Sequence, residues 1–122
     1  MLFRSSKMKK LIALSMLMIP SAYAHHSFAM FDNTKDVVLE GTVKEFQWTN
    51  PHTWTQVMVD GVEWSVEGGS PNGLKRSGWT KTSMKPGDKI VMTIHPLKDG
   101  TPGGSFVKAT VNGVPVGTPR GE

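Results

Sequence analysis

The sequence predicts an all-β fold with a short helical insert, a small five-stranded Greek-key barrel of the OB-like (oligonucleotide/oligosaccharide-binding) type. Three observations indicate it. Apolar and polar residues alternate with a period of two in several short runs, an Asp-Gly pair joins two of these runs, and a helix start lies between the third and fourth. A β-sandwich is the competing architecture, but a sandwich usually has more strands and no central helix.

The first expected strand is long and changes phase along its length. From Val37 to Val43 every second residue is apolar or glycine, and the apolar phase then slips by one residue to Phe46 and Trp48. Such a slip predicts a β-bulge or a sharp coil. A long coiled strand suits this barrel, because it must bend to pair with a neighbour on each side. We expect a turn after it at residues 50–52.

The second and third strands form the clearest hairpin in the chain. Residues 53–59 and 62–66 are joined by Asp60-Gly61, a pair typical of two-residue hairpin turns. On the expected alternation, the tryptophans at positions 48, 54 and 64 point into the core.

The helical insert and the last two strands come next along the chain. Ser70 and Pro71 fit the cap and the first position of a helix, and residues 74–84 can hold one or two short helical turns. The fourth strand is expected at 89–95 and the fifth at 106–111, with a loop rich in glycine and proline between them.

These elements define one domain with short extensions. The barrel domain is expected at residues 37–114, and 25–36 form an extended N-terminal arm that Phe28 and Phe31 would hold against the barrel. Residues 115–122 have no pattern and are expected to fray. A chain of this length suffices for one domain and is too short for two.

The first 24 residues have the parts of a cleavable signal peptide. Four basic residues precede an apolar segment at Leu11–Ile19, and Ala22-Tyr23-Ala24 is the kind of site that signal peptidase cuts after. The uncharged stretch is shorter than the roughly 20 residues that a membrane span needs, so no stable membrane anchor is expected. The sequence therefore predicts Sec-type export and a soluble periplasmic protein that begins at His25.

Charge and composition exclude several classes of function. Cleavage would remove four basic residues and no acidic ones, which leaves ten of each. A nucleic-acid binder needs a clustered surplus of lysine and arginine, so nucleic acid is not an expected partner. There is no cysteine, which excludes disulfides and thiolate ligands. No catalytic triad order, paired carboxylates or phosphate loop is present, and the sequence favours a binding protein over an enzyme.

Four histidines remain in the mature chain: His25, His26, His52 and His95. His52 lies in the turn after the first strand and His95 at the end of the fourth. In this barrel the corresponding loops flank the usual ligand face, which predicts that the two imidazoles lie at one end. The flexible arm would let His25 reach them.

A mature N-terminal histidine offers unusual metal chemistry. Its α-amino nitrogen and its imidazole belong to one residue, and both give up protons to a metal readily near neutral pH. Together with a second histidine they form the arrangement called a histidine brace. Nitrogen donors without thiolates favour Cu(II), with zinc as the second choice. The hypothesis names His25, His52 and His95 as ligands. In the alternative, the imidazole of His26 binds the metal together with the terminal amine and the amide nitrogen between them.

Three segments together resemble a known family. His25–Asp32 (HHSFAMFD), Glu40–Val43 (EGTV) and Trp48–His52 (WTNPH) are similar to segments of small exported bacterial proteins catalogued as a domain of unknown function. The resemblance covers essentially the whole mature chain. It implies export and a single small β-domain, and it brings no activity, substrate or ligand residues.

Two other interpretations stay open. The chain can be a periplasmic OB-like module that binds an organic ligand or a protein partner, with the histidines in structural or incidental roles. A small copper-dependent redox enzyme is the third, although no substrate or axial ligand is indicated. The sequence does not specify an oligomeric state.

Overall fold

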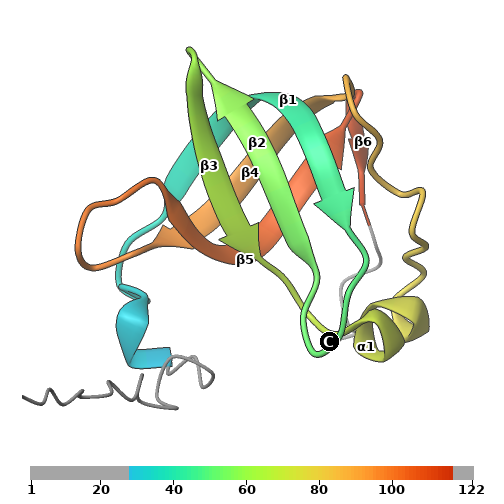
Figure 1. Cartoon of the computed structure of the whole chain (residues 1–122), viewed down its shortest axis with the longest axis horizontal. Coiled ribbons are helices and arrows are strands. Elements are labelled where there is room, and N and C mark those ends of the chain that lie inside the picture. The colour runs from blue at the N-terminus through green and yellow to red at the C-terminus, as the bar shows by residue number, and fades with distance from the viewer. Residues whose placement is uncertain (1–27, 117–122) are drawn as a thin grey trace, which may run out of the picture.

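The computed structural model describes residues 28–116, in which five strands close into a barrel (Figure 1). The strands are β1 (Val37–Gln47), β2 (Trp54–Val59), β3 (Val62–Glu67), β4 (Lys89–Pro96) and β5 (Gly103–Val111). Antiparallel pairs link β3, β2, β1, β4 and β5 in that order, and a parallel pairing of β3 with β5 closes the circle. This confirms the predicted OB-like Greek-key barrel with a short helical insert, in place of a sandwich.

β1 pairs with two neighbours because it bends. Its first half pairs with β4 from Val37 to Thr42, and its second half pairs with β2 from Thr42 to Gln47. The register with β2 shifts between Val43 and Glu45, which confirms the bulge predicted from the slip in phase. Gly41 lies just before the point where β1 stops pairing with β4 and starts pairing with β2. A Cβ at this position would meet the backbone carbonyl of Met58 in β2.

The hairpin of β2 and β3 forms at Asp60 and Gly61, which have positive φ angles of 49° and 81° as a type I′ turn requires. The core position predicted for Trp54 is wrong. Thr55 and Val57 face the core and are buried, whereas Trp54 lies on the opposite face of β2 and lines a small outer cavity. The inward threonine is tolerated because its hydroxyl has a partner, the sulfur of Met84.

The helix α1 (Pro71–Arg76) lies between β3 and β4, below one end of the barrel in Figure 1. Ser70 caps it by accepting a hydrogen bond from the Gly73 backbone N–H, and proline occupies the first position, as predicted. The chain after Arg76 continues as turns. It buries Trp79, whose ring packs against Phe46 and Phe106 with centroids 6.0 and 5.3 Å away.

β5 begins three residues earlier than the sequence indicated, at Gly103. Gly103 and Gly104 pair with β3 on one side, and Gly104 also pairs with β4. A Cβ at Gly104 would meet the carbonyl of His95, so the close approach of the strands requires glycine there. A two-residue strand, β6 (Val114–Pro115), then pairs with the end of β5.

The core fills the barrel with inward side chains from all five strands. It is almost entirely aliphatic, and Trp79 and Met84 from the segment after α1 complete it. The buried strand residues are Leu39, Val43, Val57, Val66, Ile90, Met92, Ile94, Ala109 and Val111.

Within residues 28–116 no helix has the length and apolar character to cross a membrane.

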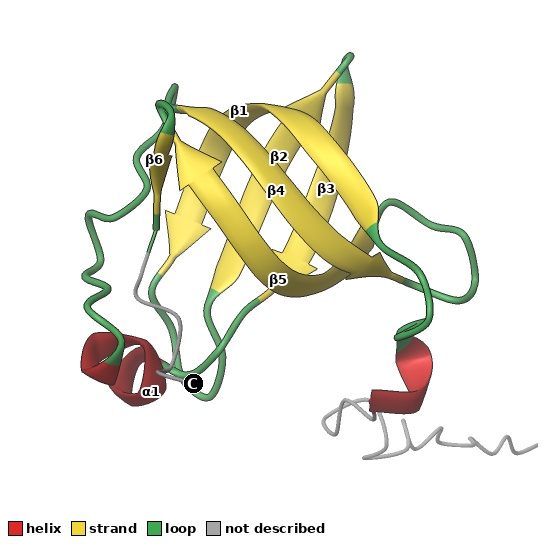
Figure 2. Cartoon of the chain, turned by 180° about the vertical axis from the view of Figure 1, so that it is seen from behind, coloured by secondary structure: helices red, strands yellow, loops and turns green. Residues whose placement is uncertain are grey.

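The N-terminal arm is anchored to the barrel beside the loop between β4 and β5, as both views show (Figures 1 and 2). It begins with a single 3-10 turn, η2 (Phe28–Met30). Phe31 is only 5% exposed and forms a β-bridge with Leu97. Two backbone hydrogen bonds flank the bridge, from Asp32 to the Pro96 carbonyl and from Lys98 to the Met30 carbonyl. The arm is therefore attached to the barrel before β1 begins.

Candidate functional site

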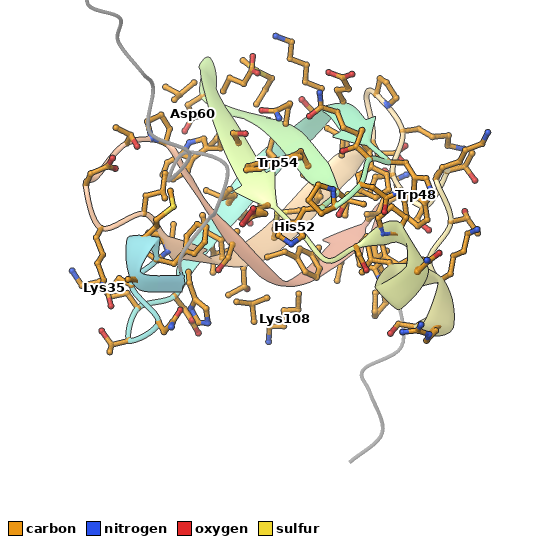
Figure 3. All side chains as sticks on the ribbon, turned by 60° about the horizontal axis from the view of Figure 1, so that its bottom comes forward. Lys35, Trp48, His52, Trp54, Asp60 and Lys108 are labelled. Atoms are coloured by element: carbon orange, nitrogen blue, oxygen red, sulfur yellow. The ribbon has the colours of Figure 1, made fainter. Side chains whose placement is uncertain are left out.

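His52 and His95 line the same cavity, which has a volume of about 630 Å³. It lies at the end of the barrel that comes forward in Figure 3, where His52 sits between the anchored arm and α1. The two histidines are far apart in sequence, and the barrel topology brings them to one end. Its walls are Phe31 and Asn33 of the arm, Glu67 at the end of β3 with the next three residues, and Ser105 and Phe106 of β5.

His52 is oriented by a buried carboxylate. Its Nδ1 lies 3.0 Å from Oε2 of Glu67, a residue that is only 8% exposed. The backbone of the turn is fixed as well, because the Thr49 hydroxyl donates a hydrogen bond to the His52 carbonyl at 2.7 Å. Hydrogen-bond contacts thus fix His52 both at Nδ1 of its ring and at its backbone carbonyl.

His95 is oriented by the arm. It lies on the outer face of β4, opposite Ser105 of β5. Its Nδ1 is 3.0 Å from the carbonyl oxygen of Lys35 and 3.2 Å from Oδ1 of Asp36. Both groups belong to the end of the arm, so the segment that would carry the mature N-terminus also positions this ring.

The two rings share one hydrogen-bonding pattern. A carbonyl oxygen can only accept a hydrogen bond, so Nδ1 of His95 donates to the Lys35 carbonyl. Nδ1 of His52 is likewise the ring nitrogen that lies at hydrogen-bond distance from an oxygen, here Oε2 of Glu67. In the neutral imidazole the other nitrogen, Nε2, then keeps its lone pair. Histidines that bind metals generally donate their second N–H to a carboxylate or a backbone carbonyl in this way. The Nδ1 contacts of His52 and His95 are of this kind.

The loop that carries Gly68 and Gly69 is tied to the start of β2. Gly68 donates to the Thr53 carbonyl, while the backbone N–H and the hydroxyl of Thr53 both donate to the Gly69 carbonyl. A Cβ on Gly68 would come within 2.6 Å of the Thr53 hydroxyl oxygen. Glycine therefore lets this wall of the cavity approach the barrel closely.

The chain matches the model of the Family of unknown function (DUF6152) over residues 13–106. The chain belongs to this family. This confirms the resemblance drawn from the His25–Asp32, Glu40–Val43 and Trp48–His52 segments, all of which lie within the matched residues. The match also includes every residue that lines the histidine cavity. A search of curated proteins found no similar sequence.

Asp32 does not take part in the cavity. Its Oδ1 accepts hydrogen bonds from the backbone N–H and the hydroxyl of Thr34, and these bonds close a turn at residues 32–34. The hydrogen bond from the Thr34 side chain lowers the pKa of this carboxyl, with smaller contributions from the backbone N–H and from nearby Lys35. The turn sets the direction in which the arm enters β1.

The remaining candidate ligands, His25 and His26, lie outside the described residues. Within residues 28–116, no cluster of three or more histidine, aspartate or glutamate side chains is arranged to hold a metal ion. The described part supplies two oriented imidazoles and one buried carboxylate.

Sequence reasoning missed Glu67 and the carbonyl of Lys35. Glu67 occupies an outward position of β3, where a glutamate is ordinarily solvated, and no local signal marks it as buried. Its burial depends on the parallel pairing of β3 with β5 and on the cavity walls around it. These are long-range features of the closed barrel.

Proposed function

We propose that this protein is exported to the periplasm, loses residues 1–24, and binds one Cu(II) ion in the histidine cavity through His25, His52 and His95. The observation that carries the proposal is the shared location of His52 and His95 and the shared contact at their Nδ1 atoms. Both line one cavity, and both use Nδ1 on oxygen acceptors, which keeps Nε2 for a metal.

The anchored arm makes His25 a suitable third ligand. Phe31 is both a wall of the cavity and the point where the arm is attached to the barrel. His25 precedes Phe31 by six positions, a length of chain that spans at most about 20 Å. Its amine and imidazole can therefore reach the cavity without any movement of the barrel.

The donor set favours copper. Three imidazoles and an amine, with no thiolate and no thioether required, bind Cu(II) more tightly than the other common divalent ions, and zinc is the next candidate. His26, with the terminal amine and the intervening amide, is the alternative N-terminal ligand set. The Glu67 carboxylate, 3.0 Å from His52, would act through that ring rather than on the metal.

Replacement of both barrel histidines tests the proposal. The variant His52→Ala/His95→Ala of the mature protein is expected to bind Cu(II) at least about 100-fold more weakly, because it loses two ligands. Mutation of a residue that only hydrogen-bonds to a ligand already lowers metal affinity by about 10- to 100-fold. Isothermal titration against a competing chelator measures the change. Circular dichroism and thermal unfolding show that the barrel is intact, and an unchanged affinity in a folded variant would refute the site.

Glu67 provides a finer test. Glu67→Ala is expected to lower Cu(II) affinity by about 10- to 100-fold, because His52 loses the acceptor that fixes its tautomer. Glu67→Gln should lose less, since its amide oxygen still accepts the hydrogen bond. Glu63→Ala is the matched control, as Glu63 lies on the same strand and pairs with Lys44 at the surface. Equal effects at positions 63 and 67 would show that Glu67 has no specific role.

A small organic ligand is the second candidate function. The cavity is larger than one metal ion needs, its volume lies in the range of small-molecule pockets, and Phe31 and Phe106 provide apolar contacts. Such binding would not depend on the chemistry of the N-terminus. This function would be favoured if the mature protein binds no copper and if a protein with an extended N-terminus still binds the organic ligand.

A further inference from the structure

A second hollow lies next to the loop between β1 and β2 and has no residue in common with the histidine cavity. Its volume is about 590 Å³. Trp48 forms one wall, and Figure 3 shows this residue beside α1. The other lining residues belong to the end of α1 and the turns after it, and they are Lys75, Gly78, Trp79, Thr80 and Lys81.

The hollow is positively charged. Residues 68–87 contain Lys75, Arg76, Lys81 and Lys85 and no aspartate or glutamate. Among residues 28–116, neither Lys75 nor Lys81 lies within ion-pair distance of a carboxylate. These cations are concentrated at one site on a protein whose mature chain has no formal net charge, so the hollow would attract an anionic ligand.

Trp48 provides a fixed aromatic surface. It is half-buried, and its ring packs edge-on against Phe46 with centroids 5.8 Å apart. Phe46 in turn contacts Trp79, which is only 6% exposed and also packs against Phe106. Trp48 is thus supported from behind by the core. Trp79 is too covered to be a second stacking surface, and the hollow has one aromatic face.

We propose that this hollow binds an acidic sugar unit, with the apolar face of the sugar ring on Trp48 and its carboxylate or phosphate between Lys75 and Lys81. A single aromatic face with a polar rim suits a sugar ring, which uses its other side and its edge for hydrogen bonds. A nucleobase can also stack on one aromatic ring, so a nucleotide is the ligand that the experiment must distinguish from the acidic sugar. Binding here is independent of the copper site, since the two cavities have separate walls.

Titration with defined oligosaccharides tests this proposal. Trigalacturonic acid is expected to bind the mature protein and to shift the Trp48 indole N–H resonance, whereas neutral galactotriose binds at least about tenfold more weakly, because it lacks the charges that pair with the lysines. The affinity should fall as salt is raised. Uridine monophosphate serves as the nucleotide probe. Binding of that probe alone, or equal binding of both trisaccharides, would overturn the proposal.

Variants locate the site on the surface. Lys75→Ala/Lys81→Ala changes two exposed side chains and is expected to weaken trigalacturonic acid binding about tenfold or more. Lys89→Ala/Lys108→Ala removes the same charge from exposed strand positions and should have a much smaller effect. Trp48→Ala should also weaken binding if it remains folded. Equal losses in the two lysine pairs, or no binding of trigalacturonic acid at millimolar concentration, would refute the site.

Discussion

A mature chain with one extra residue ahead of His25 is expected to bind Cu(II) at least about 100-fold more weakly than the chain that begins at His25. The extension turns the α-amine of His25 into an amide nitrogen, which binds a metal only if it loses a proton that it holds tightly. The chelate formed by amine and imidazole is lost. The loss of a nitrogen that binds the metal directly should lower the affinity more than the loss of a residue that only hydrogen-bonds to a ligand, which costs about 10- to 100-fold.

Chelator competition measures this difference. Glycine added ahead of His25 gives the smallest extension, and glycine added after Glu122 is the matched control, because it changes chain length by the same amount and leaves the N-terminus intact. We expect the control to match the unextended protein. Unchanged affinity in the N-terminally extended form would remove His25 from the site, and any copper bound to His52 and His95 would then need another explanation.

Gly41→Ala is expected to have the largest effect on stability. The Cβ of an alanine at this position would overlap the carbonyl oxygen of Met58. The backbone has little room to adjust, because this part of β1 is paired with β4 while the adjoining residues pair with β2. Overpacking in a well-packed interior typically destabilises by 1–3 kcal/mol, and a clash with backbone should reach about 3 kcal/mol or more.

Urea unfolding monitored by tryptophan fluorescence measures the loss of stability. Gly73→Ala is the control, because Gly73 lies in α1 and its added Cβ would meet only the Ser70 hydroxyl, at 3.1 Å. Alanine is the better helix former, so this change should alter stability by no more than about 1 kcal/mol. A Gly41→Ala variant as stable as the original protein would show that β1 has more freedom than its pairing implies.

The fold could be predicted where a local pattern had only one structural solution. The slip in phase before Phe46 indicated the bulge, Asp60-Gly61 the hairpin, and Ser70-Pro71 the helix start. Prediction failed where long-range contacts decided the outcome. Trp54 looked like a core residue, yet the inward positions of β2 belong to Thr55 and Val57, because a hydrogen-bonded threonine can be buried at that end of the barrel.

The location of the two cavity histidines was predictable from the sequence, and the groups that contact them were not. His52 and His95 follow from the barrel topology, since the loop between β1 and β2 and the end of β4 lie at one end. Glu67 and the Lys35 carbonyl do not, because the parallel pairing of β3 with β5 and the docking of the arm bring them to the rings. Gly103 and Gly104, which start β5, were assigned to a loop because glycine gives no strand signal in the sequence. Their role depends on long-range contacts, since they allow β5 to lie close to the backbones of β3 and β4.

The most direct test of the copper site is electron paramagnetic resonance of the mature protein, beginning at His25, with one equivalent of Cu(II). We predict an axial Cu(II) spectrum with coupling to at least three nitrogens. Incorporation of ¹⁵N-histidine should change that coupling, and the His52→Ala/His95→Ala variant should lose part of it. A spectrum dominated by oxygen donors, or one that the double variant reproduces unchanged, would contradict the proposed site.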